Sequence, residues 1–333
     1  MRGIIKPATT GTGIIFCISM LLAIAPEVTH AEDMNARAQQ LLNAMADATR
    51  KLDYDGIFIY RRDHRMDTMR LIHKVDGDGE RERLVSLSGH PREVIRNKQT
   101  VTCFFPENRV LMVEKSRNQE LISRQIPESL DKVADMYKFS VVDEDRIAGR
   151  NAWVVAIKPI DSYRYGYRLW IDKGNNLLLK SDLQNNKGDV LEQILFTKLD
   201  VVKNIPDKLL QPSVSGSGFT RIQTSEASPE IVNKPVPWQI RWMPVGFKMK
   251  NYEQQSMTEE RNVVDHLVYS DGLAMVSVFI EKSKQPSRFI PGPLKKGALN
   301  AYARLANGYQ VTAVGEVPQS TVQRMAISVT AGP

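Results

Sequence analysis

The chain has 333 residues and carries 45 basic against 38 acidic side chains, a formal charge of +7 at neutral pH. This mild excess contains no dense run of Lys or Arg, so it argues against a nucleic-acid partner, while it permits contact with anionic lipid headgroups or an acidic protein segment. At roughly 100–200 residues per domain, the length predicts two domains whose cores need no covalent staples.

The N-terminus has the three parts of a secretory signal peptide. A basic start is followed by an apolar stretch, residues 14–24, and by a small-residue cleavage site that ends at Ala31. The apolar stretch is shorter than the roughly 20 residues that cross a bilayer as a helix, so a retained membrane anchor is the less favoured alternative. We therefore predict cleavage near Ala31 and export. Cys103 is the cysteine that would remain, without a partner for an internal disulfide.

The first part of the mature chain is predicted to be one helix followed by a meander of strands. Leu41, Leu42 and Met45 recur at helical spacing, which predicts a helix over residues 34–52 with Asp33 as its N-cap. The hydrophobic period then changes to two. The predicted strands are residues 54–60, 68–75, 83–87, 93–96, 100–105 and 110–113.

A second helix and further strands are predicted next. Apolar residues from Ile126 to Tyr137 share one helical face and predict an amphipathic helix over residues 126–137. Strands are expected again at residues 139–142, within residues 146–183 and at residues 190–199. Strands in such numbers with two helices indicate the α+β class, with the helices lying on an antiparallel sheet.

Residues 146–183 contain the strongest strand signal. Its two alternating sets are Tyr163, Tyr165, Tyr167, Leu169 and Ile171, and Arg164, Gly166, Arg168, Trp170 and Asp172. Period-two alternation places the two sets on opposite faces of a sheet. We therefore expect a strand that is apolar on one face and solvated on the other, and the question is what the tyrosine face covers.

The composition changes at residues 213–236, where Ser, Gly and Pro show no apolar period and predict a linker. It would separate a first domain, residues 32–212, from a smaller α+β domain, residues 237–333. The signals in the smaller domain are two hairpin turns, Asp271-Gly272 and Asn307-Gly308, and a final helix with Ser320 as its cap and Val322, Met325, Ala326 and Val329 on its apolar face.

No pattern in the sequence predicts catalysis, a cofactor or a metal site. The histidines lack metal-ligand spacing, and surface or turn positions are favoured for His64, His73, His90 and His266. Ser129 and Lys132 match S-x-x-K, for which a helix start is the favoured interpretation. Cys103 lies in an apolar strand with no basic neighbour in sequence, so a buried structural thiol is favoured over a nucleophile. We therefore expect a protein that is not an enzyme.

The aromatic residues concentrated in the first domain are more informative about function. They are consistent with a filled sheet core, and equally with a curved sheet that leaves a partly open apolar hollow. In such a hollow each buried CH₂ of a lipid chain would contribute roughly 0.8 kcal/mol. The candidates for lining it are Phe58, Tyr60, Tyr163, Tyr165, Tyr167 and Leu169.

Blocks in both domains resemble one known family. In the first domain they are residues 91–96 (PREVIR), 146–150 (RIAGR), 163–172 (YRYGYRLWID), 177–183 and 191–193; in the second they are residues 242–247 (WMPVGF), 267–273 (LVYSDGL) and 314–318 (VGEVP). Together they resemble the MucB/RseB family, periplasmic regulators of the envelope-stress (extracytoplasmic function) sigma factor, over nearly all of the mature chain. The turn at residues 173–176 departs from the Thr-Gly pair expected there, which alters a loop only.

The resemblance implies a fold and a role. The first domain is expected to be similar to lipoprotein carriers, with a curved antiparallel sheet partly closed by helices. Family members bind the periplasmic segment of a membrane-spanning anti-sigma factor and shield it from regulated proteolysis, and lipid or lipopolysaccharide signals release them. For this chain the resemblance implies a periplasmic, non-enzymatic regulator with such a partner and no cofactor, and a second copy of the chain is a further candidate partner.

Two hypotheses follow for the site. The tyrosine face would line a lipid-accessible hollow, and Trp242, Phe247 and Tyr269 of the second domain would contribute to partner binding. The rival interpretation is a lipid or lipoprotein carrier, which would share the first-domain fold, although simple carriage needs no second domain.

Overall fold

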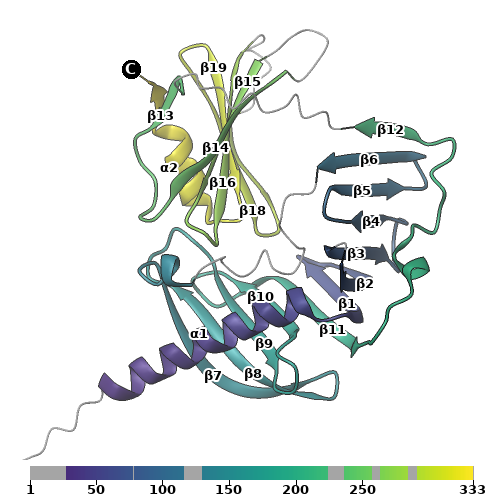
Figure 1. Ribbon diagram of the computed structural model, residues 1–333. Helices are drawn as coiled ribbons and strands as arrows, with labels where there is room; N and C mark the ends of the chain where they lie inside the picture. Colours follow the sequence, from purple (N-terminus) through teal and green to yellow (C-terminus); the bar gives the residue numbers. More distant parts are fainter. Residues whose placement is uncertain are drawn as a thin grey trace, which may run out of the picture.

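The structure is a computed structural model that describes residues 28–77, 79–115, 130–223, 236–256, 263–283 and 291–332 (Figure 1). The expected signal peptide therefore lies almost entirely outside the described residues, as does Ser129. Within these ranges, no helix combines the length and the apolar character that crossing a bilayer requires.

Helix α1, Val28–Lys51, packs along one face of a large sheet (Figure 1). It begins five residues before Asp33, so the prediction that Asp33 caps it is wrong. Its buried face was predicted correctly, since Leu42 and Met45 have no exposed surface. Burying such a stripe against a sheet, and not helix propensity, provides most of the stability of a helix of this kind.

The large sheet has twelve strands among the described residues, in the order β12-β6-β5-β4-β3-β2-β1-β11-β10-β9-β8-β7. Its first half is the predicted meander. The strands are β1 Tyr54–Arg62, β2 Arg65–Asp76, β3 Gly79–Ser86, β4 Glu93–Arg96, β5 Thr100–Phe105 and β6 Val110–Lys115. Each pairs antiparallel with the next, because short turns join neighbours in the chain.

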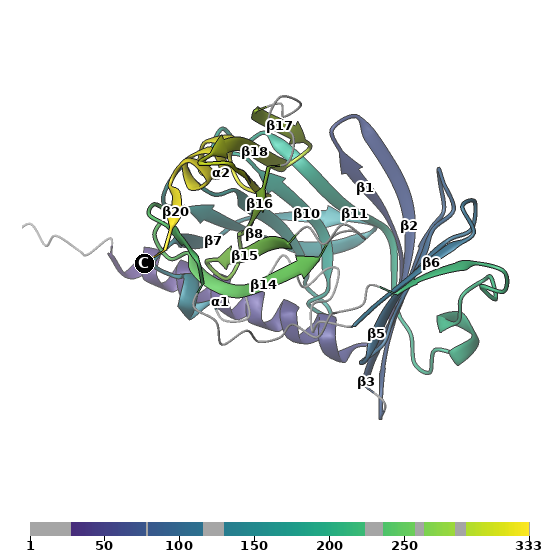
Figure 2. The ribbon, with the colours of Figure 1, turned by 90° about the horizontal axis from the view of Figure 1, so that it is seen from above.

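The second half of the sheet runs from β7 to β11. The strands are β7 Tyr137–Ile147, β8 Arg150–Pro159, β9 Gly166–Asp172, β10 Leu178–Gln184 and β11 Val190–Val201. β11 pairs with β1, and a register shift at Ile57/Phe58 accompanies the bend between the two halves (Figure 2). At Gly56 a Cβ atom would lie 2.6 Å from the Phe196 ring, so the ring packs against the bend only because residue 56 is glycine.

The amphipathic helix predicted over residues 126–137 is wrong for the described part. Residues 116–129 lie outside the described residues, and the rest forms a short 3₁₀ helix, Asp131–Val133, followed by the start of β7. Leu130, Val133 and Tyr137 are nevertheless buried. The apolar spacing identified these three residues, but Ala134, which a helix would place on the same face, is exposed in the turn between the 3₁₀ helix and β7.

The segment after β11 crosses the outer face of the meander. It forms a 3₁₀ helix, Asp207–Leu210, and then strand β12, Thr220–Gln223, which pairs parallel with β6. Asp207 accepts hydrogen bonds from Lys74 (2.7 Å) and Arg81 (2.9 Å), and Arg83 donates to the Ser213 hydroxyl at 2.6 Å. Part of the region expected to be a linker is therefore a strand of the large sheet.

The C-terminal part is a six-stranded sheet with a helix on one face (Figure 1). The strands are β14 Lys248–Ser256, β15 Val263–Ser270, β16 Met275–Lys282, β17 Gly292–Lys296, β18 Leu299–Ala306 and β19 Tyr309–Gly315; the helix is α2, Gln319–Ile327; and β13, Trp238–Ile240, pairs with β20, Val329–Ala331.

Both predicted hairpins of this part are confirmed. Asp271-Gly272 joins β15 to β16, and Asn307-Gly308 joins β18 to β19 with φ angles of 52° and 82°, as a two-residue primed turn requires. The apolar face of α2 is also confirmed, since Val322, Met325 and Ala326 have no exposed surface. The helix begins at Gln319 after Pro318, so Ser320 lies inside it and does not cap it.

Candidate functional site at the domain junction

The tyrosine stretch does not form one continuous strand. β9 begins at Gly166, and residues 160–165 are the connection from β8. The opposite face of β9 is not solvated as expected, because Trp170 and Asp172 are buried. Trp170 donates to Asp145 at 2.8 Å, and Asp172 pairs with Arg150. Connection 160–165 instead lies against the second domain, and we call this contact the domain junction.

Arg164 is the centre of the domain junction. Its side chain is completely buried, and it reaches across to the β15–β16 turn, where it donates to Asp271 at 2.5 Å. It also donates twice to Asp161, at 2.8 and 3.1 Å, and to the carbonyl of Val245 at 2.7 Å. A buried guanidinium requires partners of this kind, because an unpaired charge in the interior is strongly destabilising.

Asp271 is also held in place by hydrogen bonds from its own turn and from Tyr137. Its carboxylate accepts hydrogen bonds from the backbone N–H groups of Leu273 (2.8 Å) and Ala274 (2.7 Å) and from the hydroxyl of Tyr137 at 3.0 Å. Burial and the neighbouring Asp271 charge raise the pKa of Tyr137 well above its ordinary value. Burial lowers the pKa of Arg164, but its hydrogen bonds to Asp161 and the nearby charges, including that of Asp271, together outweigh this effect and leave the pKa raised.

Two aromatic residues complete the domain junction on the α2 side. Trp242 meets the ring of Tyr163 edge-on at 5.1 Å, and Arg324 of α2 lies 3.9 Å from the centre of the Trp242 ring and donates to the Tyr163 hydroxyl. Thr321, also on α2, donates to the Tyr163 carbonyl at 2.7 Å. Arg324 is exposed, and a cation–π contact at an exposed site contributes about 0.5–1 kcal/mol.

The next two tyrosines also face the second domain. Tyr165 packs with Leu183 against Ala298, and its hydroxyl accepts a hydrogen bond from Asn300 at 2.9 Å. Burial raises the pKa of Tyr165, while the bond from Asn300 opposes this. Tyr167 is half-buried beside the same cluster, and burial raises its pKa too.

The other lipid-hollow candidates lie elsewhere. Phe58 and Leu169 belong to the main core under α1, where Phe58 meets Phe196 at 5.3 Å. Tyr60, near the end of β1, is partly buried against the same core and donates to Glu192 at 2.6 Å. The six candidates therefore do not line one space: three face the second domain, and three lie in or against the main core.

The three partner-binding candidates are also placed differently from one another. Trp242 is half-buried at the domain junction. Phe247 is buried with its ring 5.5 Å from the Arg164 guanidinium. Tyr269 is buried in the core beneath α2.

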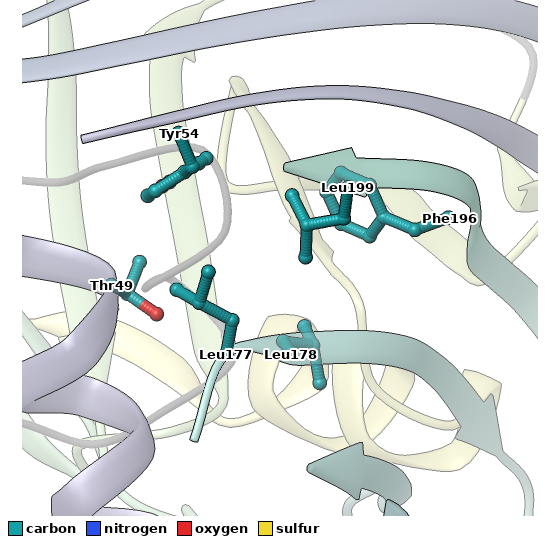
Figure 3. Close-up of a pocket in the computed structure, with 6 residues that line it drawn as sticks. All are labelled: Thr49, Tyr54, Leu177, Leu178, Phe196 and Leu199. Atoms are coloured by element: carbon teal, nitrogen blue, oxygen red, sulfur yellow. The ribbon is translucent and has the colours of Figure 1, made fainter. Parts of the chain in front are cut away.

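Beneath α1 the core is almost completely filled. A cavity of about 10 Å³ remains between α1, β1, β10 and β11, and the side chains around it point toward one another (Figure 3). Its lining residues are Thr49, Tyr54, Leu177, Leu178, Phe196 and Leu199. This volume accommodates about one water molecule and no acyl chain.

A second, open groove of about 400 Å³ lies outside the meander, between β3, β4 and the segment around Asp207. Its charged groups are already paired, since Arg96 bonds Glu82 at 2.8 Å and Arg81 bonds Asp207 at 2.9 Å. With opposite charges neutralised in this way, the groove attracts neither anions nor cations strongly.

The described residues contain no group of His, Cys, Asp and Glu that could hold a metal ion. The expectation that every histidine is at the surface is wrong for His73, which is completely buried and stacked on Tyr54 at 4.7 Å. Cys103 is half-buried, and burial followed by the charge of Glu114 raises its pKa, so the thiol is poorly suited to nucleophilic attack.

Sequence reasoning missed the residues that hold the domain junction together: Arg164, Asp271, Asn300, Thr321 and Arg324. Arg164 and Asp271 are 107 positions apart, so no local pattern connects them. One sequence signal could have identified Arg164. It lies between Tyr163 and Tyr165, in one of the blocks that resemble the MucB/RseB family.

Comparisons with known proteins agree with the two-part architecture. The family model described as the MucB/RseB N-terminal domain matches residues 37–214, and the MucB/RseB C-terminal domain matches residues 232–330. The chain is 33% identical to the sigma factor AlgU regulatory protein MucB of Pseudomonas aeruginosa, over 96% of each chain. It is 29% identical to the sigma-E factor regulatory protein RseB of Haemophilus influenzae, over 92% of this chain and 94% of the relative.

Solved structures match both domains together. The crystal structure of MucB in complex with MucA(peri) gives a TM-score of 0.70 at 29% identity, over 89% of this chain and 99% of that one. The crystal structure of MucB alone gives 0.62 at 30% identity, over 89% and 98%.

Proposed function

The chain belongs to the MucB/RseB family, and on this premise we propose that it is a non-enzymatic periplasmic regulator. It binds the periplasmic segment of a membrane-spanning anti-sigma factor and shields that segment from regulated proteolysis. A lipid or lipopolysaccharide signal releases it. Export requires removal of the signal peptide near Ala31.

The observation that carries this proposal is the match over both domains to MucB in complex with MucA(peri). The names of the relatives, regulatory proteins of the sigma factors sigma-E and AlgU, support the same role.

The domain junction is the proposed control element. A ligand displaces a partner only if it favours an arrangement that binds the partner poorly. Here, changing the arrangement of the domains breaks the buried contact between Arg164 and Asp271 and separates Tyr163 from Trp242. The tyrosine face would then become accessible, and a lipid chain could occupy the surface that the second domain covers.

The second domain is the proposed partner-binding part. Trp242 is the candidate with surface available for contact, while Phe247 and Tyr269 would support it from beneath. The lipid or lipoprotein carrier remains the alternative, but the cavity of about 10 Å³ under α1 provides no room for carriage in this arrangement.

The test is capture from a membrane extract by the mature protein, with and without lipopolysaccharide. We expect one small membrane protein to be captured and to be lost when lipopolysaccharide is added. Replacing Trp242 by Leu should weaken capture, whereas Trp153→Leu, which removes a ring held between Arg37 and Lys173, should not. Absence of capture would refute the binding role, and capture unaffected by lipopolysaccharide would refute the release mechanism.

A further inference from the structure

Two exposed apolar side chains come together at the outer rim of the domain junction. Val245 is 77% exposed and Ile160 is 56% exposed. Val245 lies in the turn before β14, and its carbonyl accepts the hydrogen bond from Arg164. Ile160 follows β8 and donates its backbone N–H to the carbonyl of Met136 at 3.0 Å.

These two positions are adjacent because Met136 lies under the turn that carries Val245. A Cβ atom on Gly246 would meet the Met136 sulfur at 2.8 Å, and the φ of +87° at this glycine fixes the turn in a conformation that other residues rarely adopt. Ile160 and Val245, which we call the two apolar tips, therefore both lie next to the buried residue Met136, one from each domain.

Three lysines lie close to the two tips in the chain or in the strand register. Lys138 and Lys158 are directly opposed in the β7–β8 register, and Lys248 begins β14 on the other side. All three are exposed, and in the described ranges no carboxylate forms an ion pair with any of them. Opposed like charges destabilise an antiparallel pair, so this arrangement does not serve the local fold.

The acidic groups nearby do not cancel this charge. Asp161 and Asp271 are both bonded to Arg164 inside the domain junction. Asp135 is exposed, and Lys132, three residues earlier in the chain, is exposed as well. The rim of the domain junction therefore presents apolar tips within a positive field.

We propose that this rim, defined as Ile160, Val245, Lys138, Lys158 and Lys248, docks on the surface of an anionic phospholipid bilayer. The apolar tips enter the interfacial region, and the lysines pair with lipid phosphates. The inference does not rest on anti-sigma binding. It adds a membrane-contact surface at the rim of the domain junction, and it would hold the domain junction against the bilayer.

The test is sedimentation of the mature protein with vesicles of phosphatidylcholine alone or with about 30% phosphatidylglycerol. We expect binding to the anionic vesicles only, lost when salt rises from about 0.05 to about 0.5 M. Lys158→Gln should lower the partition coefficient about fivefold. Joint replacement of Ile160 and Val245 by Ser should lower it about tenfold.

The controls are an exposed apolar residue and an exposed lysine elsewhere. Met66→Ser, at a side chain 66% exposed on β2, and Lys282→Gln at the end of β16 should leave binding unchanged. The inference is wrong if the unmodified protein does not bind anionic vesicles, or if the controls lower binding as much as the rim variants. It is also wrong if the rim variants weaken capture of a protein partner while vesicle binding persists. Circular dichroism of each variant checks that it is folded.

Discussion

The buried contact between Arg164 and Asp271 should determine how firmly the two domains are held together. Arg164→Met keeps the length of the side chain and removes its charge. In the variant, Asp271 stays buried with only Tyr137 and two backbone N–H groups as partners. Removing one member of a buried pair costs about 3–5 kcal/mol, because the other charge remains unpaired in the interior.

The assay is urea unfolding followed by tryptophan fluorescence, since Trp242 lies in the domain junction beside Tyr163 and Arg324. A loss of about 3–5 kcal/mol corresponds to a hundredfold to several-thousandfold shift toward undocked domains. Because the two domains have separate cores, we expect the variant to unfold in two transitions, the Trp242 signal changing first.

The matched control is Arg50→Met on α1. Arg50 also pairs with an aspartate, Asp47 at 2.8 Å, but the side chains are 47% and 52% exposed, so the expected loss is below about 1 kcal/mol. The reasoning would be refuted if Arg164→Met lost no more stability than this control. Asp271→Asn must destabilise too, because it keeps the shape of the turn and removes the charge.

Three further outcomes are expected. Leu169→Ala should cost about 2–5 kcal/mol in the free energy of unfolding because Leu169 is completely buried, while Leu294→Ala, at a side chain 69% exposed, should cost little; thermal unfolding compares them. Alkylation of Cys103 at pH 8 should be slower in the native protein than in urea, since burial raises the thiol pKa and lowers the thiolate fraction; equal rates would contradict this. The pKa of Tyr137 is raised in the folded protein, so its contribution to stability is fully present below the unfolded-state pKa of about 10 and is lost as the pH rises above that value. The urea midpoint of unfolding should therefore fall between pH 9 and 11, and it should fall less in Tyr137→Phe.

Local patterns predicted most of the strands. The meander from β1 to β6, both hairpin turns and the apolar faces of α1 and α2 follow from the period of the apolar residues and from turn chemistry, which act over a few residues. The same reasoning failed at residues 126–137. Helical spacing identified Leu130, Val133 and Tyr137 as buried, but a short 3₁₀ helix and a strand bury these three and leave Ala134 exposed.

Partners distant in the sequence could not be predicted. The hydroxyl of Tyr165 contacts Asn300, and Tyr163 lies against Trp242, contacts that depend on how two separately folded parts meet. Alternation along residues 163–172 indicated that tyrosines face something apolar. It contained no information on whether that is a lipid, the sheet's own core or another domain.

By itself, the sequence predicted export, an α+β chain of two parts, the buried faces of α1 and α2 and a resemblance to the MucB/RseB family. Only the tertiary structure decided what the tyrosine face covers. Tyr163 and Tyr165 lie against the second domain, and between them Arg164 is buried because Asp271, 107 residues away, supplies the charge that it needs. The physical reason is that side-chain periodicity specifies which face leaves water, whereas the group that replaces water is specified by three-dimensional packing and charge pairing.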